Sequence, residues 1–265
     1  MLILIRGAGD LASGIALRLF RAGLDVAMTD LPKPTAIRRT VCFSQAIPLG
    51  ECTVEDVTAV RAASAADARR ILAERKIPVL CDPGCECRRE LRPDALVDAI
   101  LAKKNLGTRI TDAPVVIGVG PGFTAGTDCH AVIETMRGHT LGRVIREGSA
   151  LPNTGIPGEI GGKSAERVLR APQDGVFHGL RQIGDRVEAG DAVAEVGGLT
   201  MRTAISGVLR GILADGTQVF AGMKAGDVDP RCEVAHCFTA SDKALAIGGG
   251  VLEAVLALSG ALRRG

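Results

Sequence analysis

The sequence has no tryptophan and no tyrosine, and only six of its 265 residues are phenylalanine. Proteins that hold single-stranded nucleic acid stack the bases on aromatic rings or arginine planes. The net charge of +2 adds no strong attraction to a phosphate backbone. These absences argue against a nucleic-acid partner. They also mean that the pure protein should absorb weakly near 280 nm, so that a bound chromophore would stand out.

Long hydrophobic runs and targeting signals are also scarce. The first residues, MLILIRGAGD, lack the basic leader and cleavage site of a secretory signal. Residues 244–262 are mostly apolar, but three consecutive glycines and Glu253 favour a buried C-terminal helix over a membrane span. We therefore expect a cytoplasmic protein without a membrane segment. Its eight cysteines are then expected to be thiols, metal ligands or redox groups rather than disulfides.

The N-terminus carries the most informative pattern, in which an apolar run, a glycine turn, an amphipathic stretch and a second apolar run follow one another. This is the layout of a dinucleotide-binding βαβ unit, in which the helix N-terminus holds a phosphate. Gly7 would permit the tight turn, Gly9 would let the backbone approach a phosphate, and Ala12 would let the helix pack closely. Asp30, at the end of the second run, could accept hydrogen bonds from ribose hydroxyls.

The acidic residue at position 10 leaves two interpretations of this turn open. The carboxylate of Asp10 could cap the same helix N–H groups and repel a pyrophosphate. In that case the glycines serve packing alone. The first interpretation predicts NAD(P) or another nucleotide as the ligand, and its binding residues are Gly7, Gly9, Asp10, Ala12 and Asp30.

The predicted fold is α/β with a second, smaller module. Alternating apolar runs and helix-like stretches predict a Rossmann-like parallel-sheet domain over residues 1–163, which ends in a Gly- and Pro-rich segment. A pattern G-V-x-x-G-x-x-x-x-G-x-x-V-x-A-G begins at Gly175 and recurs 32 residues later, at Gly207. Two copies predict a small all-β module over residues 164–235. We expect residues 236–265 to form a helix that packs back on the α/β domain.

The all-β module resembles a biotinyl/lipoyl-type barrel-sandwich domain, most clearly in the turn and strand of Ile183–Val196. Carrier domains of that type present a lysine at the hairpin between the two copies. Here that hairpin is Gly197–Arg202 and contains no lysine. The resemblance therefore implies a barrel-sandwich fold and a docking or lid module rather than a carrier.

Three cysteines fall within seven residues, directly after a predicted strand. Cys81, Cys85 and Cys87 could together hold a soft metal, a cluster or sulfur. A structural zinc site would need a fourth ligand from elsewhere in the chain. The alternative is that these are loop cysteines without a chemical role.

Residues 118–136 concentrate further reactive groups behind a glycine-rich turn. If Ala131–Thr135 is a strand, His130 and Glu134 project to one face. His130 could then act as an acid and base near neutral pH, oriented by a carboxylate. Alternatively, His130 caps a strand end and Glu134 pairs with Arg137. The candidate ligand-binding residues of this segment are Gly120, Gly122 and Gly126, and the candidate catalytic residues are Asp128, His130 and Glu134.

Several longer blocks are similar to one bacterial family. They include IRGAGDLASG at residues 5–14, KPTAIRRTVCF at residues 33–43, and APVVIGVGPGFTAGTDCHAVIETMRGH at residues 113–139. Over essentially its whole length the chain resembles the YqeB-type accessory proteins of selenium-dependent molybdenum hydroxylase systems. The resemblance implies a cytoplasmic protein that helps to mature a molybdenum hydroxylase client.

Three functions follow as hypotheses. The first is an accessory protein that binds a nucleotide- or pterin-type ligand, such as the molybdenum cofactor, and contacts its client through the β-module. The second is an NAD(P)-dependent oxidoreductase of a small metabolite, with Asp30 on ribose and His130 as proton relay. The third is a thiol-based carrier of a metal, sulfur or selenium. Whether the protein is an enzyme or a homo-oligomer stays open.

Overall fold

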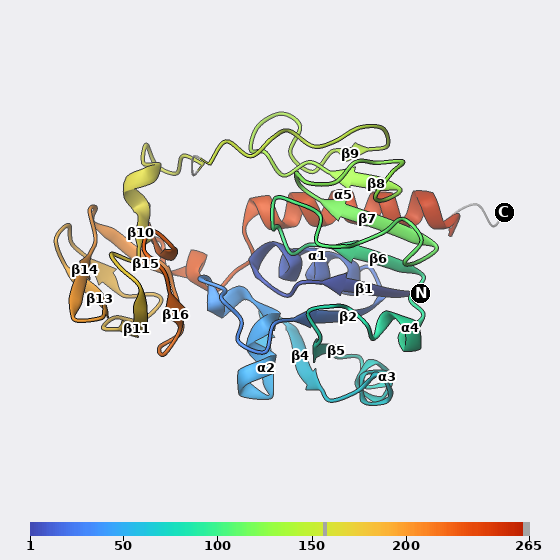
Figure 1. Ribbon diagram of the computed structural model, residues 1–265, viewed down its shortest axis with the longest axis horizontal. Coiled ribbons are helices and arrows are strands. Elements are labelled where there is room, and N and C mark those ends of the chain that lie inside the picture. Colours follow the sequence, from blue (N-terminus) through green and yellow to red (C-terminus); the bar gives the residue numbers. More distant parts are fainter. Residues whose placement is uncertain (156–157, 262–265) are drawn as a thin grey trace. The chain divides into compact units, whose positions relative to one another are not determined.

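The computed structural model describes residues 1–155 and 158–261, which divide into two compact units (Figure 1). The large unit comprises Met1–Pro34, Cys42–Asn153 and Ala240–Gly265, and the small unit comprises Thr35–Val41 and Thr154–Thr239. The sequence placed a boundary at residue 163 and did not assign residues 35–41 to the β-module. These residues join the small unit by backbone pairing, since the Ile212 N–H donates to the Ile37 carbonyl at 2.9 Å.

The large unit is built on one mixed sheet. In the described part of the chain it has nine strands in the order β3-β4-β5-β2-β1-β6-β7-β8-β9 (Figure 1). The strands are β1 (Leu2–Arg6), β2 (Asp25–Asp30), β3 (Glu51–Val54), β4 (Val57–Ala62), β5 (Ile77–Cys81), β6 (Ala95–Asp98), β7 (Val115–Val119), β8 (Ala131–Ile133) and β9 (Val144–Ile145). Neighbours from β4 to β8 pair in parallel, whereas β3 and β9 pair antiparallel at the two edges.

Five helices lie in the described part of the large unit. They are α1 (Asp10–Arg21), α2 (Ala46–Leu49), α3 (Ala65–Ala73), α4 (Arg88–Leu91) and α5 (Asp242–Ser259). Short 3-10 turns lie at Phe43–Gln45 in the large unit and at Arg39–Val41, Ala165–Arg167 and Val234–Cys237 in the small unit. The Ser64 hydroxyl accepts the Asp67 N–H at the start of α3, and the Ser241 hydroxyl accepts the Ala244 N–H at the start of α5. None of the described helices is long and apolar enough to cross a bilayer.

Helices α1 and α5 lie side by side because small residues meet between them. A Cβ atom added at Gly14 would lie only 2.5 Å from the Cβ of Ala244. The Gly14 and Gly248 positions therefore let the two backbones approach more closely than ordinary side chains allow. This contact covers one face of the sheet with helices from opposite ends of the chain.

The expected Rossmann-like parallel sheet is wrong, although the N-terminal β1–α1–β2 unit is present with parallel pairing. Both edges of the sheet are antiparallel, and β2 lies beside β5 rather than beside the strand that follows it in the chain. Within the described residues, the connection from β5 to β6 carries only the four-residue α4, and those leading to β7 and β8 carry no helix. The connections that lead to β6 and β8 are rich in glycine, proline and other turn residues, which do not sustain the expected crossover helices.

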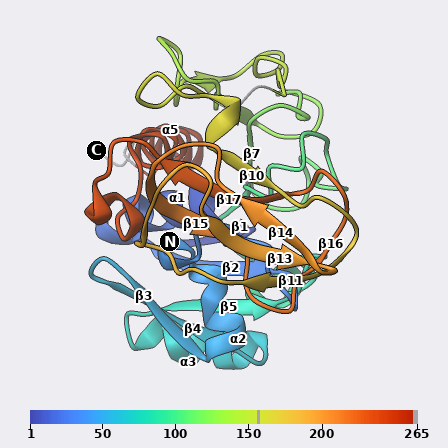
Figure 2. The same ribbon diagram turned by 90° about the vertical axis from the view of Figure 1, so that its left-hand side faces the viewer.

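The small unit consists of two antiparallel sheets, ordered β10-β17-β15-β12 and β14-β13-β11-β16 in its described residues (Figure 2). The strands are β10 (Val168–Arg170), β11 (Gly175–Gly179), β12 (Arg186–Val187), β13 (Ala192–Val196), β14 (Leu199–Arg202), β15 (Gly207–Ile212), β16 (Gln218–Val219) and β17 (Lys224–Asp229). Each repeat copy gives two strands to one sheet and its middle strand to the other. The core between the sheets contains Phe177, Val193 and Leu209, all fully buried.

This arrangement corrects the expectation of a closed barrel-sandwich of the biotinyl/lipoyl type. The repeat does produce paired strands, but β10 and β14 each end a sheet without a further strand among the described residues. A glycine and valine pattern reports the turns and inward positions of short strands. It does not report how two sheets close, because closure depends on which edges meet.

Candidate functional site

The carboxyl ends of β1 and β6 meet at the point where the strand order reverses, and this is where open α/β sheets bind ligands. Two charged residues end these strands, Arg6 on β1 and Asp98 on β6. The Arg6 Nη1 lies 3.2 Å from the Asp98 Oδ2, and the two residues are only 9% and 2% exposed. The Thr108 hydroxyl donates to the same carboxylate oxygen at 2.6 Å. The crevice is therefore filled by the protein's own ion pair.

The remaining N–H groups of Arg6 fix the loops around it. Its Nε and Nη2 donate to the Pro83 carbonyl at 3.3 and 3.2 Å, and Nη2 also donates to the Leu106 carbonyl at 3.2 Å. Arg6 thus ties the loop after β5 to the loop after β6. Because its charge is balanced by Asp98 and its donors are used, Arg6 shapes the site rather than offering a free cation.

A cavity of about 230 Å³ lies beside Arg6, between the loops that follow β5 and β6. Arg88 and Asp112 line it, and the Arg88 Nε donates to the Asp112 Oδ1 at 3.2 Å. The Arg88 Nη1 donates to the Cys85 carbonyl at 2.9 Å and to the Glu86 Oε1 at 3.3 Å, whereas Nη2 makes no hydrogen bond to another described residue. The cavity therefore presents a cationic donor beside a carboxylate acceptor.

In the glycine turn between β1 and α1, one glycine is required by packing and the other lies open. Gly7 has a φ of +104°, and a Cβ there would lie 2.9 Å from the Ala99 carbonyl oxygen, so this glycine is required by its neighbours. No atom of the described residues lies within 4 Å of a Cβ built on Gly9, which caps α1. Ala12 is buried against the sheet, and Asp10 lies half-buried in the first turn of α1. Only Gly9 fits the predicted open approach to a phosphate.

Asp30 stands where the sequence predicted a ribose-binding carboxylate, but its two oxygens hold the backbone of the turn. Oδ2 accepts the Ala8 N–H at 2.8 Å, and Oδ1 accepts the Leu31 N–H at 2.7 Å. Burial raises the pKa of Asp30 above its ordinary value, and the two N–H groups act in the opposite direction. Asp30 therefore stabilises the glycine turn.

The structure does not bring His130 and Glu134 together. The His130 Nδ1 accepts the Val116 N–H at 3.0 Å. Glu134 is 2% exposed, and its carboxylate accepts the N–H groups of Thr135, Met136 and Leu151 at 2.7 to 2.8 Å. The prediction that a carboxylate from Glu134 orients His130 is therefore wrong. The suggested alternative partner, Arg137, pairs with Asp242 instead.

Asp128 and two of the neighbouring glycines also have structural roles in the loops. The Asp128 carboxylate accepts the Thr124 N–H at 2.8 Å and the Asn105 side-chain amide at 3.2 Å. A Cβ at Gly120 would lie 2.9 Å from the Thr135 hydroxyl oxygen, and one at Gly122 would lie 2.6 Å from the Lys104 backbone. Of the three predicted glycines, Gly126 alone is open among the described residues.

The three clustered cysteines do not form a metal centre. In residues 1–155 and 158–261, no three metal-ligating side chains are grouped to hold an ion. Cys81 is exposed, whereas Cys85 and Cys87 are 2% and 9% exposed and pack in the apolar core. The neighbouring Cys85 thiol raises the pKa of Cys87, and burial and Asp82 act in the same direction. Cys87 is therefore a protonated, apolar thiol.

Thiol labelling should reflect these environments. We expect iodoacetamide to modify Cys81 at least about tenfold faster than Cys85 or Cys87, because the reagent reaches an exposed thiol more readily than a buried one. Peptide mapping by mass spectrometry after short exposures measures each rate. Equal rates at Cys81 and Cys85 would contradict the described burial.

Of the residues that line the cavity, only Cys85 was a candidate from the sequence. Arg88 begins the short helix α4 and Asp112 lies in a loop, both without a recognisable motif, and Arg6 and Asp98 were counted with their strands. One signal was available, namely a charged residue directly at the end of a buried apolar strand. Two such ends, on β1 and β6, mark the reversal point of the sheet.

The fold and the cavity define a two-unit protein whose large unit is built on a mixed sheet, with a polar cavity at the carboxyl edge of that sheet. No protein-family model matches the chain. In sequence it is 54% identical over 257 residues to the uncharacterized protein YqeB of Escherichia coli (strain K12). The alignment covers 97% of this chain and 48% of YqeB, so the chain spans about half the length of the curated relative that it matches. The match supports a relationship to YqeB-type proteins.

Likeness to solved structures is weak. An aspartoacylase family protein from Mesorhizobium loti is 12% identical with a TM-score of 0.27, covering 86% of this chain and 84% of that one. A succinylglutamate desuccinylase from Silicibacter sp. TM1040 is 12% identical with a TM-score of 0.26 and the same coverage. Scores this low carry no argument about fold or function.

Proposed function

We propose that the chain is an accessory protein for a selenium-dependent molybdenum hydroxylase and binds a nucleotide- or pterin-type ligand at the carboxyl edge of its large sheet. The observation that carries the ligand class is the pair formed by Arg88 and Asp112 within the cavity. The accessory role is what the resemblance of the sequence blocks to YqeB-type accessory proteins implies. In this proposal the small unit contacts the client.

The chemistry of the pair favours a ring with donors and acceptors on one edge. Pterin and guanine rings carry a carbonyl oxygen next to N–H groups. The Arg88 Nη2 can donate to such a carbonyl. The Asp112 oxygens already accept the Arg88 Nε–H and the Arg109 N–H, and each keeps a second lone pair that can accept from the adjacent N–H groups. A ring without this edge would leave the half-buried ion pair of Arg88 and Asp112 facing apolar atoms, which is unfavourable.

The size of the cavity favours one ring system over a dinucleotide. Its volume of about 230 Å³ lies below the usual range of small-molecule sites, which is roughly 300 to 1,000 Å³. A phosphate of the same ligand class would find backbone N–H groups at the open N-terminus of the 12-residue α1, next to Gly9. The engagement of Asp30 by the glycine turn adds no support for the NAD(P)-dependent oxidoreductase.

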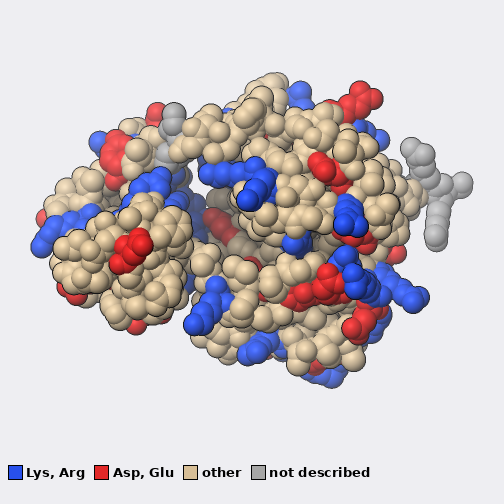
Figure 3. Space-filling model, viewed as in Figure 1, with Lys and Arg blue, Asp and Glu red and all other residues tan. Residues whose placement is uncertain are grey.

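Basic side chains are not gathered into a stripe on the face seen in Figure 3, where acidic and basic groups of the large unit are interspersed. A track for a nucleic-acid backbone needs basic groups in succession. The mixed charge of this face gives no reason to propose a nucleic-acid ligand in place of a small molecule.

Thermal unfolding with candidate ligands tests the proposal. We expect GMP or 6-hydroxymethylpterin at about 1 mM to raise the Tm, because a ligand that binds the native state stabilises it. Arg88→Met should weaken the affinity about 10- to 100-fold by removing a charged hydrogen bond. The neighbouring Arg89 is exposed and provides the matched control, Arg89→Met. No Tm shift with either ligand, or equal losses in both variants, would contradict the ligand site.

The thiol-carrier hypothesis has one supporting observation, since Cys85 lines the same cavity. Elemental analysis of anaerobically purified protein tests it. This hypothesis predicts bound selenium or metal in the wild type and its loss in Cys85→Ser. Less than about a tenth of an equivalent of any such element would remove this hypothesis.

A further inference from the structure

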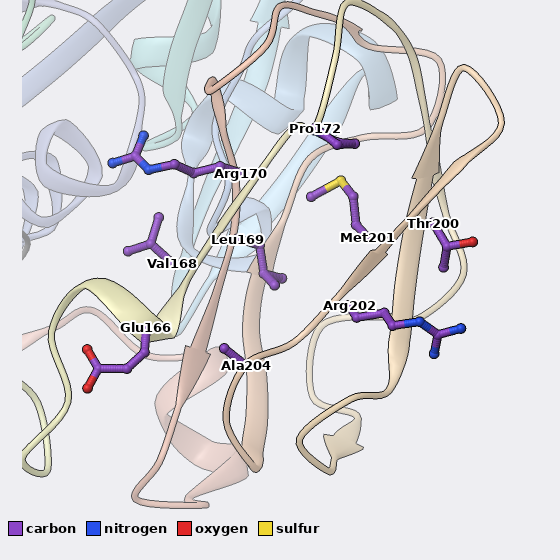
Figure 4. A pocket seen from close by; sticks show the side chains of 9 residues that line it. All are labelled: Glu166, Val168, Leu169, Arg170, Pro172, Thr200, Met201, Arg202 and Ala204. Carbon is purple, nitrogen blue, oxygen red and sulfur yellow. The ribbon is translucent and has the colours of Figure 1, made fainter.

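Both sheets of the small unit end in strands with an open edge. Among the described residues β10 pairs only with β17, and β14 pairs only with β13. A cavity of about 220 Å³ lies between these two strands (Figure 4). An open edge presents unpaired backbone N–H and C=O groups, and it is a ready template for another strand.

The cavity has an apolar floor and a basic margin. Leu169 of β10 and Met201 of β14 are each 5% exposed and line the floor. Arg170 and Arg202 are exposed and lie on opposite sides of the cavity, each extending outward (Figure 4). One nitrogen of each guanidinium donates to a backbone carbonyl, at 2.9 Å for Arg170 and 2.8 Å for Arg202. These bonds hold the arginines at the margin, where Glu166 is the one acidic lining residue.

One large hydrophobic side chain at the start of β14 is exposed, since Leu199 is 49% exposed. Phe220, which is 63% exposed, follows β16 at the opposite edge of the same sheet. Gln173 donates to the Val196 carbonyl at 3.0 Å in the turn before β14, and the Asp174 carboxylate accepts the Ala221 N–H at 2.8 Å. These two bonds hold both turns at one end of the small unit. An open strand beside exposed apolar groups is a surface that proteins normally cover.

We propose that an extended segment of a partner protein, with acidic and apolar side chains in alternation, adds to the open edge of β14. Its apolar side chains pack over Leu169 and Met201, since alternate residues of a strand point to the same face. Its acidic side chains lie on the other face, across from the exposed Arg202. The excess of arginine over glutamate at the margin selects an acidic segment. The inference rests on the proposed accessory role, to which it adds the docking surface and the chemistry of the client.

A tryptophan-labelled peptide can test this directly, because the protein itself contains no tryptophan or tyrosine. The probe is an alternating Glu-Val peptide with one terminal Trp, and its fluorescence anisotropy is followed as protein is added. We expect binding, together with amide NMR shifts at Leu199–Arg202. Arg202→Glu should weaken binding about tenfold or more through like-charge repulsion. The control Arg186→Glu changes an exposed arginine on the edge strand β12 and should bind as the wild type does.

Three outcomes would overturn the inference. These are no anisotropy change up to about 1 mM peptide, equal binding by Arg202→Glu and wild type, and equal binding of a Lys-Val peptide. A dimer of the protein that Arg202→Glu dissociates would assign the edge to a second copy and would also overturn it. The variant Arg88→Met distinguishes the two proposals. It removes a side chain of the ligand site in the large unit, and we expect it to bind the Glu-Val peptide as the wild type does.

Discussion

Replacing Gly250 by alanine should destabilise the protein by about 3 kcal/mol, whereas the same change at Gly249 should stabilise it by about 1 kcal/mol. Both residues lie in the interior of α5. A Cβ at Gly250 would overlap the Gly142 carbonyl oxygen, which is a backbone atom and does not yield as the end of a flexible side chain would. No atom of the described residues lies within 4 Å of a Cβ at Gly249. Alanine there gains helix propensity without a clash.

Urea unfolding of the two variants measures this difference, and each serves as the control for the other. The changes in composition and in intrinsic helix propensity are identical, so the sign of each effect depends on packing alone. Effects of the same sign in both variants would contradict the described contact between α5 and the loop at Gly142.

Glu134→Gln should lower the free energy of unfolding by about 3 kcal/mol, although the two side chains have nearly the same shape. The buried Glu134 carboxylate accepts three backbone N–H groups. The amide of glutamine has one oxygen and one NH₂ group, so a donor must face at least one of these N–H groups. A buried donor without an acceptor is destabilising by roughly 1 to 3 kcal/mol.

The exposed Glu253 on α5 offers the control for this change. Glu253→Gln should alter stability by less than about 0.5 kcal/mol, as is usual for surface positions. Unfolding of all three proteins in urea at neutral pH gives the comparison. If Glu134→Gln were as stable as the wild type, the carboxylate would have some use other than holding the backbone.

Local features of the large unit were predictable because nearby residues determine them. The apolar run before Gly7 and the amphipathic stretch after Gly9 do form β1 and α1, and the parallel partner β2 ends at Asp30. Steric limits on φ and the helical period act within a few residues, so that a single sequence reports them. Buried thiols, by contrast, look the same in sequence as exposed ones, and the separation of Cys81 from Cys85 and Cys87 was not visible.

Hydrogen-bond partners at the candidate site could not be read in the same way. Their spacing predicted that His130 and Glu134 lie on one face. In the structure each side chain instead accepts a hydrogen bond from a backbone N–H of another segment. Polar side chains in a folded protein bond to whichever buried group lacks a partner, and most such groups belong to the backbone. The identity of that group depends on the tertiary neighbours.

The amino-acid sequence by itself determined the N-terminal βαβ unit, the repeated strands of the small unit and the relationship to YqeB-type proteins. Only the tertiary structure decided that the large sheet is mixed and that residues 35–41 belong to the small unit. It also decided the cavity that Arg88 and Asp112 line, and the open edges of β10 and β14. Turn geometry and side-chain period are local, and they survive without neighbours. Strand order, edge pairing and cavity walls arise where distant segments meet, so they depend on contacts that no local pattern encodes.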